Sequence, residues 1–460
     1  MNPSKQTPAA VFKDEILYEI SSSANVAQFV SFGPDLGKRF HLIRGAGEAM
    51  HQANALWIEA LLKASSGHMV NVRTFRPDVS KATPFVRGLT NVDDVVASVS
   101  SLSESGFYTI VNETIDMSDG GTGGVVVGNL IEFAPCDTPR AVEASGVTSI
   151  TRAAGARILE IVYGHSLPLQ YDPTLRVEFT THPMRCGYAK QNTIIWEIER
   201  VDRVVDAVSV SWPNRFSRFI GDKAFGLLVC DAFGLPVPRT VVVSRVLAPF
   251  VFGDTTRTGE TWLRTCPKEP IPGRFSTVQR WTDPFALLKS EDPDGELIPS
   301  ILAQEAVDPA YSGSLVADAN GTLIIEGVKG TGVEFMLARQ APEPLPDFVV
   351  HSVRQLYASV AAVIGPASIE WVYDGQKTWL LQVHRGATAS KGKVIVQGEV
   401  DEYRIFDANG GLELLRNLTA SIDRSRTGIV VAGDVGVTSH IGDVLRQARV
   451  VSYIDPAAKP

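Results

Sequence analysis

A histidine near the end of the chain stands in a segment that favours phosphoryl chemistry, TGIVVAGDVGVTSHIGDVLRQARVV (427–451). The order of residues predicts a strand, a glycine turn, a helix and a second strand, with Ser439 as the helix N-cap and His440 on the first helical turn. A neutral imidazole is nucleophilic near pH 7, because its unperturbed pKa is about 6.5. A phosphoryl group on this ring would face free backbone N–H groups and the positive end of the helix dipole. The segment therefore predicts a phosphoryl carrier at His440, and a structural histidine is the alternative.

A second candidate site lies in the hairpin SIEWVYDGQKTWLLQVHR (368–385), where Glu370 and Gln382 alternate with large apolar residues. The Asp-Gly pair at its turn is typical of a two-residue loop, which would place the apolar rows of the two strands on opposite faces. An odd loop, such as 374–376, instead gathers four large side chains on one face, and we expect it because their burial should outweigh a turn preference. These side chains are Trp371, Tyr373, Trp379 and Leu381. Glu370 and Gln382 then share the other face and can hold one hard cation such as Mg²⁺, unless that face is simply solvated.

A lysine opens the helix predicted in GDKAFGLLVCDAFGLPVPRTVVV (221–243), ahead of a Gly-Pro loop and a strand. Lys223 at such a place can hold a phosphate by charge. An ordinary solvated helix lysine is the alternative interpretation.

The two halves of the chain repeat one order of features: an arginine, a short strand ending in a carboxylate, a glycine turn, and two strands that each bear an acidic or amide residue. The first half supplies Arg73, Glu113, Glu178 and Glu197, and the second supplies Arg264, Glu305, Glu370 and Gln382. We interpret this as two related modules. In the first module we expect the four side chains to converge in a cleft as a metal–nucleotide or acceptor site, with a surface salt-bridge cluster as the alternative.

Helical and strand patterns alternate along the whole chain, which predicts a mixed α/β (α+β) protein. Changes in the pattern of predicted helices and strands along the sequence predict three domains, at 1–205, 206–385 and 386–460. The segment GATASKG (386–392), with two glycines, is a candidate hinge between the second and third domains.

Composition narrows the class of protein. The chain has 460 residues, of which 44% are hydrophobic and 20% charged, so it can bury a large core. Its net charge of −8 and its lack of a long basic stripe disfavour nucleic acid as a partner. The chain has four widely spaced cysteines without a CxxC pair, and it shows no apolar leader and no run of 18 apolar residues. We therefore expect a cytoplasmic protein that neither is secreted nor spans a membrane.

Taken in order, these segments resemble the phosphohistidine dikinase family, which includes phosphoenolpyruvate synthase, pyruvate phosphate dikinase and rifampicin phosphotransferase. GDKAFGLLVCDAFGLPVP is similar to the opening of that family's ATP-grasp nucleotide-binding domain, and AQEAVDPAYSGSLV (303–316) to its adenine-side strand and SG turn. IEGVKGTGVEF (325–335) resembles its glycine-rich loop, SIEWVYDGQKTWLLQVHR its DIEW…QxRP signature, and GVTSHIGDVLRQA the TSH motif of its swivelling histidine domain. The resemblance covers about residues 215–455.

The resemblance implies a set of site residues. ATP contacts are implied for Lys223, Arg264, Gln304, Glu305, Val307, Gly330 and Gly332. Mg²⁺ ligands are implied at Glu370 and Gln382, while Arg264, Arg385 and His440 have the catalytic roles. The strands LRVEF…IIWEIE (175–199) look like an ATP-grasp ending, so Glu178 and Glu197 are further candidate metal ligands. The fold implied is a pair of ATP-grasp-like modules in tandem, followed by a small α/β swivelling domain.

The chain departs from the family in several places. Ser368 replaces the aspartate of the signature, and His384-Arg385-Gly386 replaces its Arg-Pro ending. The family's phosphoenolpyruvate barrel has no counterpart in these residues, and the histidine domain is short. The phosphoryl acceptor is therefore not specified by the resemblance.

The leading prediction is an ATP- and Mg²⁺-dependent phosphotransferase that passes a phosphoryl group through His440 to a small-molecule or protein-borne acceptor. A homo-oligomer or a partner chain would supply the acceptor domain. The alternatives are an ATP-grasp carboxylate–amine ligase that acts through an acyl phosphate, and a degenerate nucleotide-binding regulatory protein.

Overall fold

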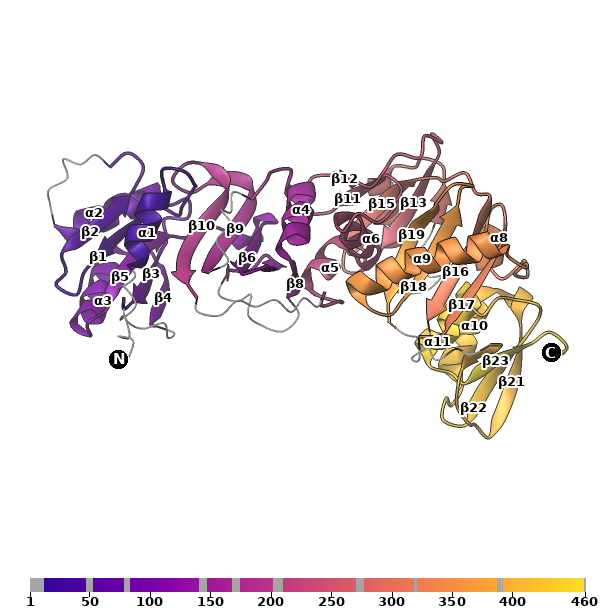
Figure 1. The fold of residues 1–460 in the computed structure, drawn as a ribbon. Coiled ribbons are helices and arrows are strands. Elements are labelled where there is room, and N and C mark those ends of the chain that lie inside the picture. Colours follow the sequence, from indigo (N-terminus) through magenta and orange to yellow (C-terminus); the bar gives the residue numbers. More distant parts are fainter. Residues whose placement is uncertain are drawn as a thin grey trace, which may run out of the picture. The chain divides into compact units, whose positions relative to one another are not determined.

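The computed structural model describes residues 12–46, 53–77, 83–139, 147–167, 174–201, 210–269, 277–317, 321–386, 390 and 392–458. The chain divides into two compact units, residues 1–208 and 209–460 (Figure 1). The predicted boundary near 205 lies outside the described residues, as do 387–389 and 391 of the candidate hinge. No helix in the described part of the chain is long and apolar enough to cross a membrane.

The first unit begins with helix α1 (Lys13–Ile20) and an antiparallel sheet in the strand order β2-β1-β5-β3-β4. Its strands are β1 (Phe29–Phe32), β2 (Lys38–Leu42), β3 (Val70–Phe75), β4 (Phe85–Leu89) and β5 (Tyr108–Glu113). Helices α2 (Asn54–Ala64) and α3 (Val92–Glu104) pack on this sheet and bury Trp57, Leu61, Val95 and Val99 in a common core. The Asn91 side chain caps α3 by accepting a hydrogen bond from the Asp93 N–H.

A second antiparallel sheet completes the first unit, in the order β10-β9-β6-β7-β8. Its strands are β6 (Thr122–Val127), β7 (Leu130–Pro135), β8 (Thr148–Thr151), β9 (Leu175–Cys186) and β10 (Gln191–Arg200). The short helix η1 (Met117–Asp119) precedes the sheet, and helix α4 (Arg152–Tyr163) packs against β7, β8 and β9. Helix α1 packs against β10.

The second unit starts with helices α5 (Arg215–Ile220) and α6 (Asp222–Ala232) and an antiparallel sheet in the order β12-β11-β15-β13-β14. Its strands are β11 (Thr240–Ser244), β12 (Phe250–Phe252), β13 (Thr261–Cys266), β14 (Thr277–Gln279) and β15 (Ser300–Glu305), with α7 (Pro284–Glu291) packed on β15. A four-stranded antiparallel sheet follows, in the order β17-β16-β18-β19. It contains β16 (Tyr311–Ala317), β17 (Leu323–Lys329), β18 (Ala367–Tyr373) and β19 (Thr378–Arg385).

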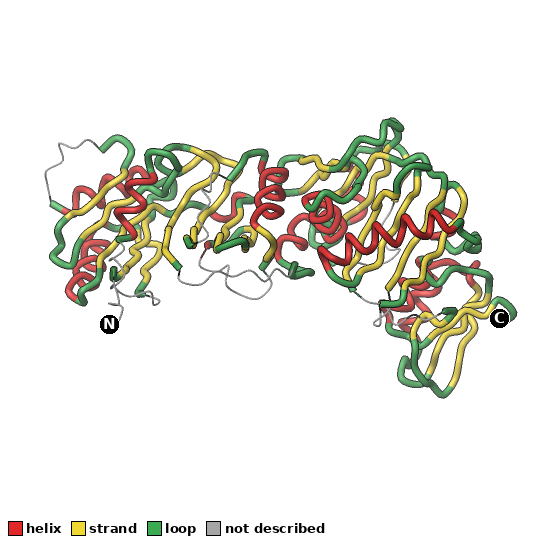
Figure 2. Tube along the Cα trace, in the orientation of Figure 1, coloured by secondary structure: helices red, strands yellow, loops and turns green. Residues whose placement is uncertain are grey.

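Helices cover one side of the four-stranded sheet. The long helix α9 (Asp347–Ile364) packs on β18 and β19, and α6 packs on β19 (Figure 2). The buried residues of α9 recur at helical spacing, as the sequence predicts: Val353, Leu356, Val360 and Ile364. The short helix α8 (Val333–Met336) contacts β16. Two antiparallel α/β lobes of this kind confirm the predicted ATP-grasp-like fold class, and the first unit repeats both sheets.

The hairpin of β18 and β19 differs from its predicted form. Tyr373 pairs with Thr378, so the loop contains four residues. The predicted three-residue loop at 374–376 is therefore wrong. The Asp374 carboxylate explains the longer loop, since its Oδ1 accepts hydrogen bonds from the N–H groups of Gln376 and Lys377. Trp379 pairs with Val372 and so lies on the face opposite Trp371, contrary to the prediction.

A β-bulge further along the same hairpin places the two site residues on one face of the sheet, as predicted. Trp371 pairs with Leu380, whereas Glu370 pairs with Gln382, so Leu381 is the extra residue on β19. Glu370 and Gln382 therefore share one face of the sheet, as predicted, although a bulge and not the loop produces the change of register.

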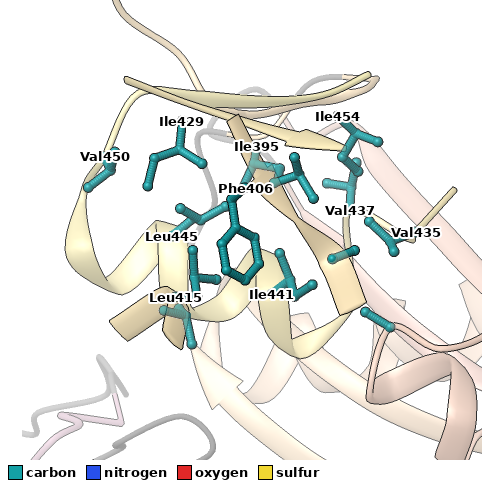
Figure 3. Packing of buried hydrophobic residues seen from close by; sticks show 14 of the residues in the cluster. Ile395, Phe406, Leu415, Ile429, Val435, Val437, Ile441, Leu445, Val450 and Ile454 are labelled. Carbon is teal, nitrogen blue, oxygen red and sulfur yellow. The ribbon is translucent and has the colours of Figure 1, made fainter. Parts of the chain in front are cut away.

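Residues 394–455 form a small sheet of their own, in the order β20-β23-β22-β21. Its elements are β20 (Val394–Val396), β21 (Glu402–Asp407), η3 (Ala408–Gly410), α10 (Gly411–Ser421), β22 (Thr427–Ala432), α11 (His440–Ala448) and β23 (Ser452–Asp455). Strands β21, β22 and β23 are parallel, and Phe406, Leu415, Ile441 and Leu445 join the strands to helices α10 and α11 in one core (Figure 3). This small α/β sheet belongs to the second compact unit, residues 209–460, and a separate domain from residue 386 onward stays a prediction.

Candidate functional site

One cavity of about 940 Å³ in the second unit gathers nearly all the site residues predicted there. Its walls come from the two antiparallel sheets, helix α6, the loop before α8, and helix α11. The predicted residues in its lining are Lys223, Arg264, Gln304, Glu305, Val307, Gly332, Glu370, Gln382, Arg385 and His440. This volume is within the usual range for a small-molecule or cofactor site. Of the predicted set, Gly330 is outside the lining, where its φ of +76° makes a left-handed turn after β17.

Lys223 is the second residue of α6, close to the helix N-terminus. Among the described residues, none forms a hydrogen bond or ion pair with its ammonium group. Burial and the nearby Arg264 charge lower the pKa of Lys223 below its usual value, although Cys266 has a raising effect. Its cationic form gains by meeting an anion in this cavity. A phosphate group is the anion that a lysine at a helix N-terminus suits best.

Arg264, on β13, reaches across to the bulge in β19. Its Nη1 donates a hydrogen bond of 3.2 Å to the carbonyl of Leu381 and lies 4.0 Å from Glu370 Oε2. Gln304, which is 1% exposed, directs its Nε2 to the same carbonyl at 3.4 Å. The bulge thus fixes the guanidinium at the floor of the cavity, beside the carboxylate of Glu370.

Glu370 and Gln382 supply the oxygen atoms that a magnesium ion prefers. They are cross-strand partners on one face, and Gln382 Nε2 contacts His384 Nε2, which leaves the amide oxygen as its ligand atom. This donor set fits Mg²⁺ held by one or two protein oxygens together with phosphate oxygens. The residues therefore fit the metal that the sequence predicts, and their role as its ligands stays a prediction.

Glu305, at the end of β15, shapes the rim of the cavity. Its Oε2 accepts hydrogen bonds from the Thr256 N–H and from the Thr255 hydroxyl, and Arg239 Nη1 lies 3.5 Å from its Oε1. Burial raises the pKa of this carboxyl, but these hydrogen bonds and the Arg239 charge outweigh burial and hold the pKa below its usual value. The Glu305 carboxylate thereby anchors the loop at 255–256 beside Val307.

His440 is the first residue of α11, and it lines the cavity. Its side chain is 28% exposed. Its Nδ1 lies 3.3 Å from Asp443 Oδ2, and Asp443 Oδ1 accepts a hydrogen bond of 2.7 Å from Arg446 Nη2. The position of Ser439 as N-cap agrees with the sequence, but its hydroxyl donates to the Gly436 carbonyl and does not cap the helix.

The electrostatic surroundings of His440 favour its protonated form. Burial alone would lower the pKa of the ring, but the hydrogen bond and charge of Asp443, together with the charge of Glu370, raise the pKa above its usual value. Burial likewise raises the pKa of Asp443, and the His440 hydrogen bond and the Arg446 charge more than reverse this, so the carboxyl is ionised. Because Asp443 engages Nδ1, Nε2 is the ring atom left for any other partner.

Arg385 has a positioning contact in addition to its place in the lining. Its Nη1 donates to the backbone carbonyls of Val210 and Trp212, at 2.9 and 3.2 Å. The guanidinium thus holds the segment before α5 in place, and its catalytic role stays a prediction.

In the first unit, three of the four residues predicted to converge do so, but as ion pairs. Arg73 Nη2 lies 2.7 Å from Glu178 Oε2, and Arg73 Nη1 lies 3.2 Å from Glu197 Oε2. Glu113 instead accepts hydrogen bonds from the backbone and side chain of Gln28. No group of three or more His, Cys, Asp or Glu side chains suited to a metal occurs among the described residues, so Glu178 and Glu197 do not form a metal site by themselves.

Three further residues of the cavity lining, Asp443, Arg446 and Asp222, were not predicted from the sequence motifs. Asp443 and Arg446 follow His440 at steps of three, a spacing that places them on one helix face and could have indicated the hydrogen-bonded chain. Asp222 accepts a hydrogen bond from the Trp212 ring nitrogen and lies 3.5 Å from His384, contacts that no local sequence signal indicates.

No family model matches the chain, and no curated protein is similar to it in sequence. Several solved structures resemble part of it. The D-alanine–D-alanine ligase from Coxiella burnetii matches with 11% identity over 36% of this chain and 47% of its own length, with a TM-score of 0.25. The D-alanine–D-alanine ligase from Bacillus anthracis complexed with ATP matches with 10% identity over 37% and 55%, with a TM-score of 0.26. D-cycloserine synthetase DcsG matches with 13% identity over 42% and 63%, with a TM-score of 0.25.

This chain thus spans about half the length of the first two of these ligases. The named structures are ATP-grasp ligases and are not members of the phosphohistidine dikinase family, so membership of that family stays a prediction. At such TM-scores these similarities add nothing about the reaction of this chain, which must be inferred from its own site.

Proposed function

We propose that the second unit is an ATP-dependent phosphotransferase in which His440 accepts a phosphoryl group from ATP bound in the cavity. The observation that supports this proposal is the presence of His440 in the same cavity lining as Lys223, Arg264 and Glu370. A histidine that served only to pack the C-terminal domain would have no need of a cavity, a carboxylate partner at Nδ1 and two cationic neighbours.

Each residue has a definite part in this proposal. Lys223 and Arg264 bind phosphate oxygens and offset the charge that develops on the transferring group. Glu370 and Gln382 hold Mg²⁺, which when bound neutralises charge on the phosphates. Glu305 and Val307 form the edge of the adenine site, as the resemblance implies.

Asp443 keeps the proton of His440 on Nδ1, so that the lone pair of Nε2 attacks phosphorus. In the transfer that the resemblance implies, this is the β-phosphorus: its bond to the oxygen shared with the α-phosphate breaks, AMP leaves with the electron pair, and water then releases the γ-phosphate as inorganic phosphate. The resemblance implies transfer of the β-phosphoryl group, with AMP and inorganic phosphate as the final products. The acceptor, whether a small molecule or protein-borne, then takes the group from Nε2.

A carboxylate–amine ligase that acts through an acyl phosphate is the second candidate, because the same cavity residues fit its first step. Lys223, Arg264, Glu370 and Gln382 would serve such a reaction equally well, since it also begins with phosphoryl transfer from ATP. The transfer would then go to a substrate carboxylate, and His440 would not be modified.

The nucleotide product distinguishes the two candidates. The protein is incubated with Mg-ATP and the nucleotides are separated by ion-exchange chromatography. AMP that is lost in the His440→Asn variant supports the phosphotransferase. ADP formed equally by wild type and His440→Asn supports the ligase, and ATP binding without turnover under any acceptor condition supports a regulatory protein.

A further inference from the structure

The two units contain the same module twice, strand for strand. In the first sheet of each unit, the second strand lies at one edge and is followed by the first, fifth, third and fourth strands. In the second sheet, the order β10-β9-β6-β7 corresponds to β19-β18-β16-β17, and β8 is an added edge strand. This topological match lets residues of the first unit be placed against those of the cavity.

Strand register assigns the first pair of equivalent residues. Arg73 on β3 pairs with Ile110 of β5, three residues before Glu113. Arg264 on β13 pairs with Leu302 of β15, three residues before Glu305. The backbone agrees as well, because the Glu113 N–H donates to the Gln28 carbonyl just as the Glu305 N–H donates to the Arg239 carbonyl.

The β-bulge occurs in both modules at the same place. Glu178 pairs with Glu197, and Trp196 is the extra residue on β10. Glu370 pairs with Gln382, and Leu381 is the extra residue on β19. In both modules the arginine donates from Nη1 to the carbonyl of the extra residue, at 2.9 Å from Arg73 to Trp196 and 3.2 Å from Arg264 to Leu381.

A lysine completes the correspondence. Helix α1 packs on β10 as α6 packs on β19, and each carries a lysine in its first turn. Lys13 Nζ lies 2.6 Å from Glu197 Oε1. Lys13, Arg73, Glu178 and Glu197 are therefore the counterparts of Lys223, Arg264, Glu370 and Gln382.

We propose that the first unit contains a second site for a magnesium-bound nucleoside polyphosphate, formed by Lys13, Arg73, Glu178 and Glu197. The class of ligand rests on the nucleotide proposed for the cavity of the second unit. The charges suit a metal–phosphate group, since phosphate oxygens take the two cations and Mg²⁺ takes the two carboxylates. Lys13 and Arg73 would then exchange their carboxylate partners for phosphate oxygens, and Glu178 and Glu197 would exchange these cations for Mg²⁺.

Stability alone is a poor reason for this cluster. The side chains of Arg73 and Glu178 are 9% and 3% exposed, and the cost of removing such charges from water largely offsets their attraction. Arg176 also lies 2.9 Å from Glu178, at the position that Ser368 has in the second module. The first module therefore has one additional cation, and Glu197 in place of Gln382 is the added anion that balances it.

The test is the number of nucleotides bound by the full-length protein. Equilibrium dialysis with Mg²⁺ and β,γ-imido-ATP, which resists hydrolysis, gives the stoichiometry for wild type and variants. We expect two bound nucleotides for wild type, one for Arg73→Ala and one for Arg264→Ala. Glu59→Gln, at an exposed position on α2 outside both sites, is expected to keep both. Lys13→Met, at a more exposed position, replaces Arg73→Ala if circular dichroism shows that the latter has not folded.

One outcome overturns this inference without affecting the proposed function: one nucleotide bound by wild type, none by Arg264→Ala, and no effect of the Arg73 or Lys13 substitutions. If wild type binds no nucleotide, both the second site and the proposed function fail.

Discussion

The protonation state of His440 decides when the ring can act as a nucleophile. Asp443 raises the pKa of the ring above its usual value, against the effect of burial, so a larger fraction of His440 is protonated near pH 7 than for a free imidazole. The protonated ring has no lone pair on Nε2. Phosphorylation of His440 should therefore become faster as the pH rises through this raised pKa.

Substitution of Asp443 tests this relation. In Asp443→Asn the negative charge that raises the His440 pKa is lost, so the pH profile of histidine labelling should reach its plateau at a lower pH than in wild type. The rate of label incorporation from ATP between pH 5 and 9 measures it. Asp401→Asn, which removes an exposed carboxylate of the same domain, serves as the control. A profile unmoved in Asp443→Asn would contradict the assigned role of Asp443.

Arg264 offers a second test at the level of a single side chain. Its guanidinium is held by the Leu381 carbonyl beside Glu370, where the proposed function has it bind a phosphate. Arg264→Ala should weaken nucleotide binding in the cavity by about ten- to a hundredfold, since a hydrogen bond to a charged group contributes about 1.5–3 kcal/mol. Titration calorimetry measures the affinity, and Arg264→Lys should recover part of it. An unchanged affinity would place the phosphates elsewhere.

At the level of elements, the close packing of α6 on β19 positions Lys223. Gly226 permits this approach, because a Cβ there would lie 2.4 Å from the Trp212 ring and 2.8 Å from Val383 Cγ1. Gly226→Ala gains about 1 kcal/mol in helix propensity. Overpacking of a dense core costs about 1–3 kcal/mol, and at such short contacts we expect the higher end, so the protein should be destabilised.

Urea unfolding monitored by tryptophan fluorescence checks this expectation. The matched control is Ser359→Ala on the exposed face of α9, which should change the free energy of unfolding by less than about 0.5 kcal/mol. Gly226→Ala as stable as Ser359→Ala would show that α6 can move away from β19 without cost.

The hairpin of β18 and β19 shows what the sequence could and could not predict. Its alternating residues predict both strands. The shared face of Glu370 and Gln382 was predicted from an odd loop, which was wrong, whereas a bulge at Leu381 produces it. The loop length was wrong, since the turn is fixed by hydrogen bonds of the Asp374 side chain. The bulge at Leu381 was not predicted either, because it depends on Arg264 and Gln304 from another sheet, which bind its carbonyl.

The same limit applies to the first unit. The order of Arg73, Glu178 and Glu197 along the chain predicts two related modules, and the sheet topology confirms that relation. The ion pairs were not predictable from spacing, because Lys13 comes from a helix 184 residues before Glu197. Glu113 was placed wrongly in the cluster, since its partner Gln28 lies next to β1 and has no motif of its own.

At the scale of the second unit, a pair of hydrogen bonds, here called the clasp, joins β17 of the four-stranded sheet to the segment before α11. Glu326 Oε2, on β17, accepts hydrogen bonds from the N–H and the hydroxyl of Thr438, at 2.8 and 2.9 Å. Gly436 allows the approach, because a Cβ there would lie 2.7 Å from the Phe335 ring. Thr438 is two residues before His440, so this clasp sets the distance between the ring and the cavity.

Loss of the clasp should separate phosphoryl transfer from nucleotide binding. In Glu326→Ala we expect histidine labelling to slow by about tenfold or more, since each hydrogen bond to the carboxylate contributes about 1.5–3 kcal/mol. The affinity for ATP should stay unchanged, because Glu326 does not line the cavity. Single-turnover labelling and calorimetry measure the two quantities. Glu334→Ala, an exposed carboxylate in α8, is the control, and equal labelling rates in both variants would remove the clasp from the account.

The proposed function depends most directly on a phosphoryl group carried by His440. The measurement is incubation of the full chain with Mg-ATP labelled separately in the β and γ positions, followed by tests of acid and base stability of the bound label. We predict acid-labile, base-stable label from the β position in wild type and none in His440→Asn. Absence of bound label from either position in wild type, or equal retention by His440→Asn, would contradict the carrier role and favour the ligase.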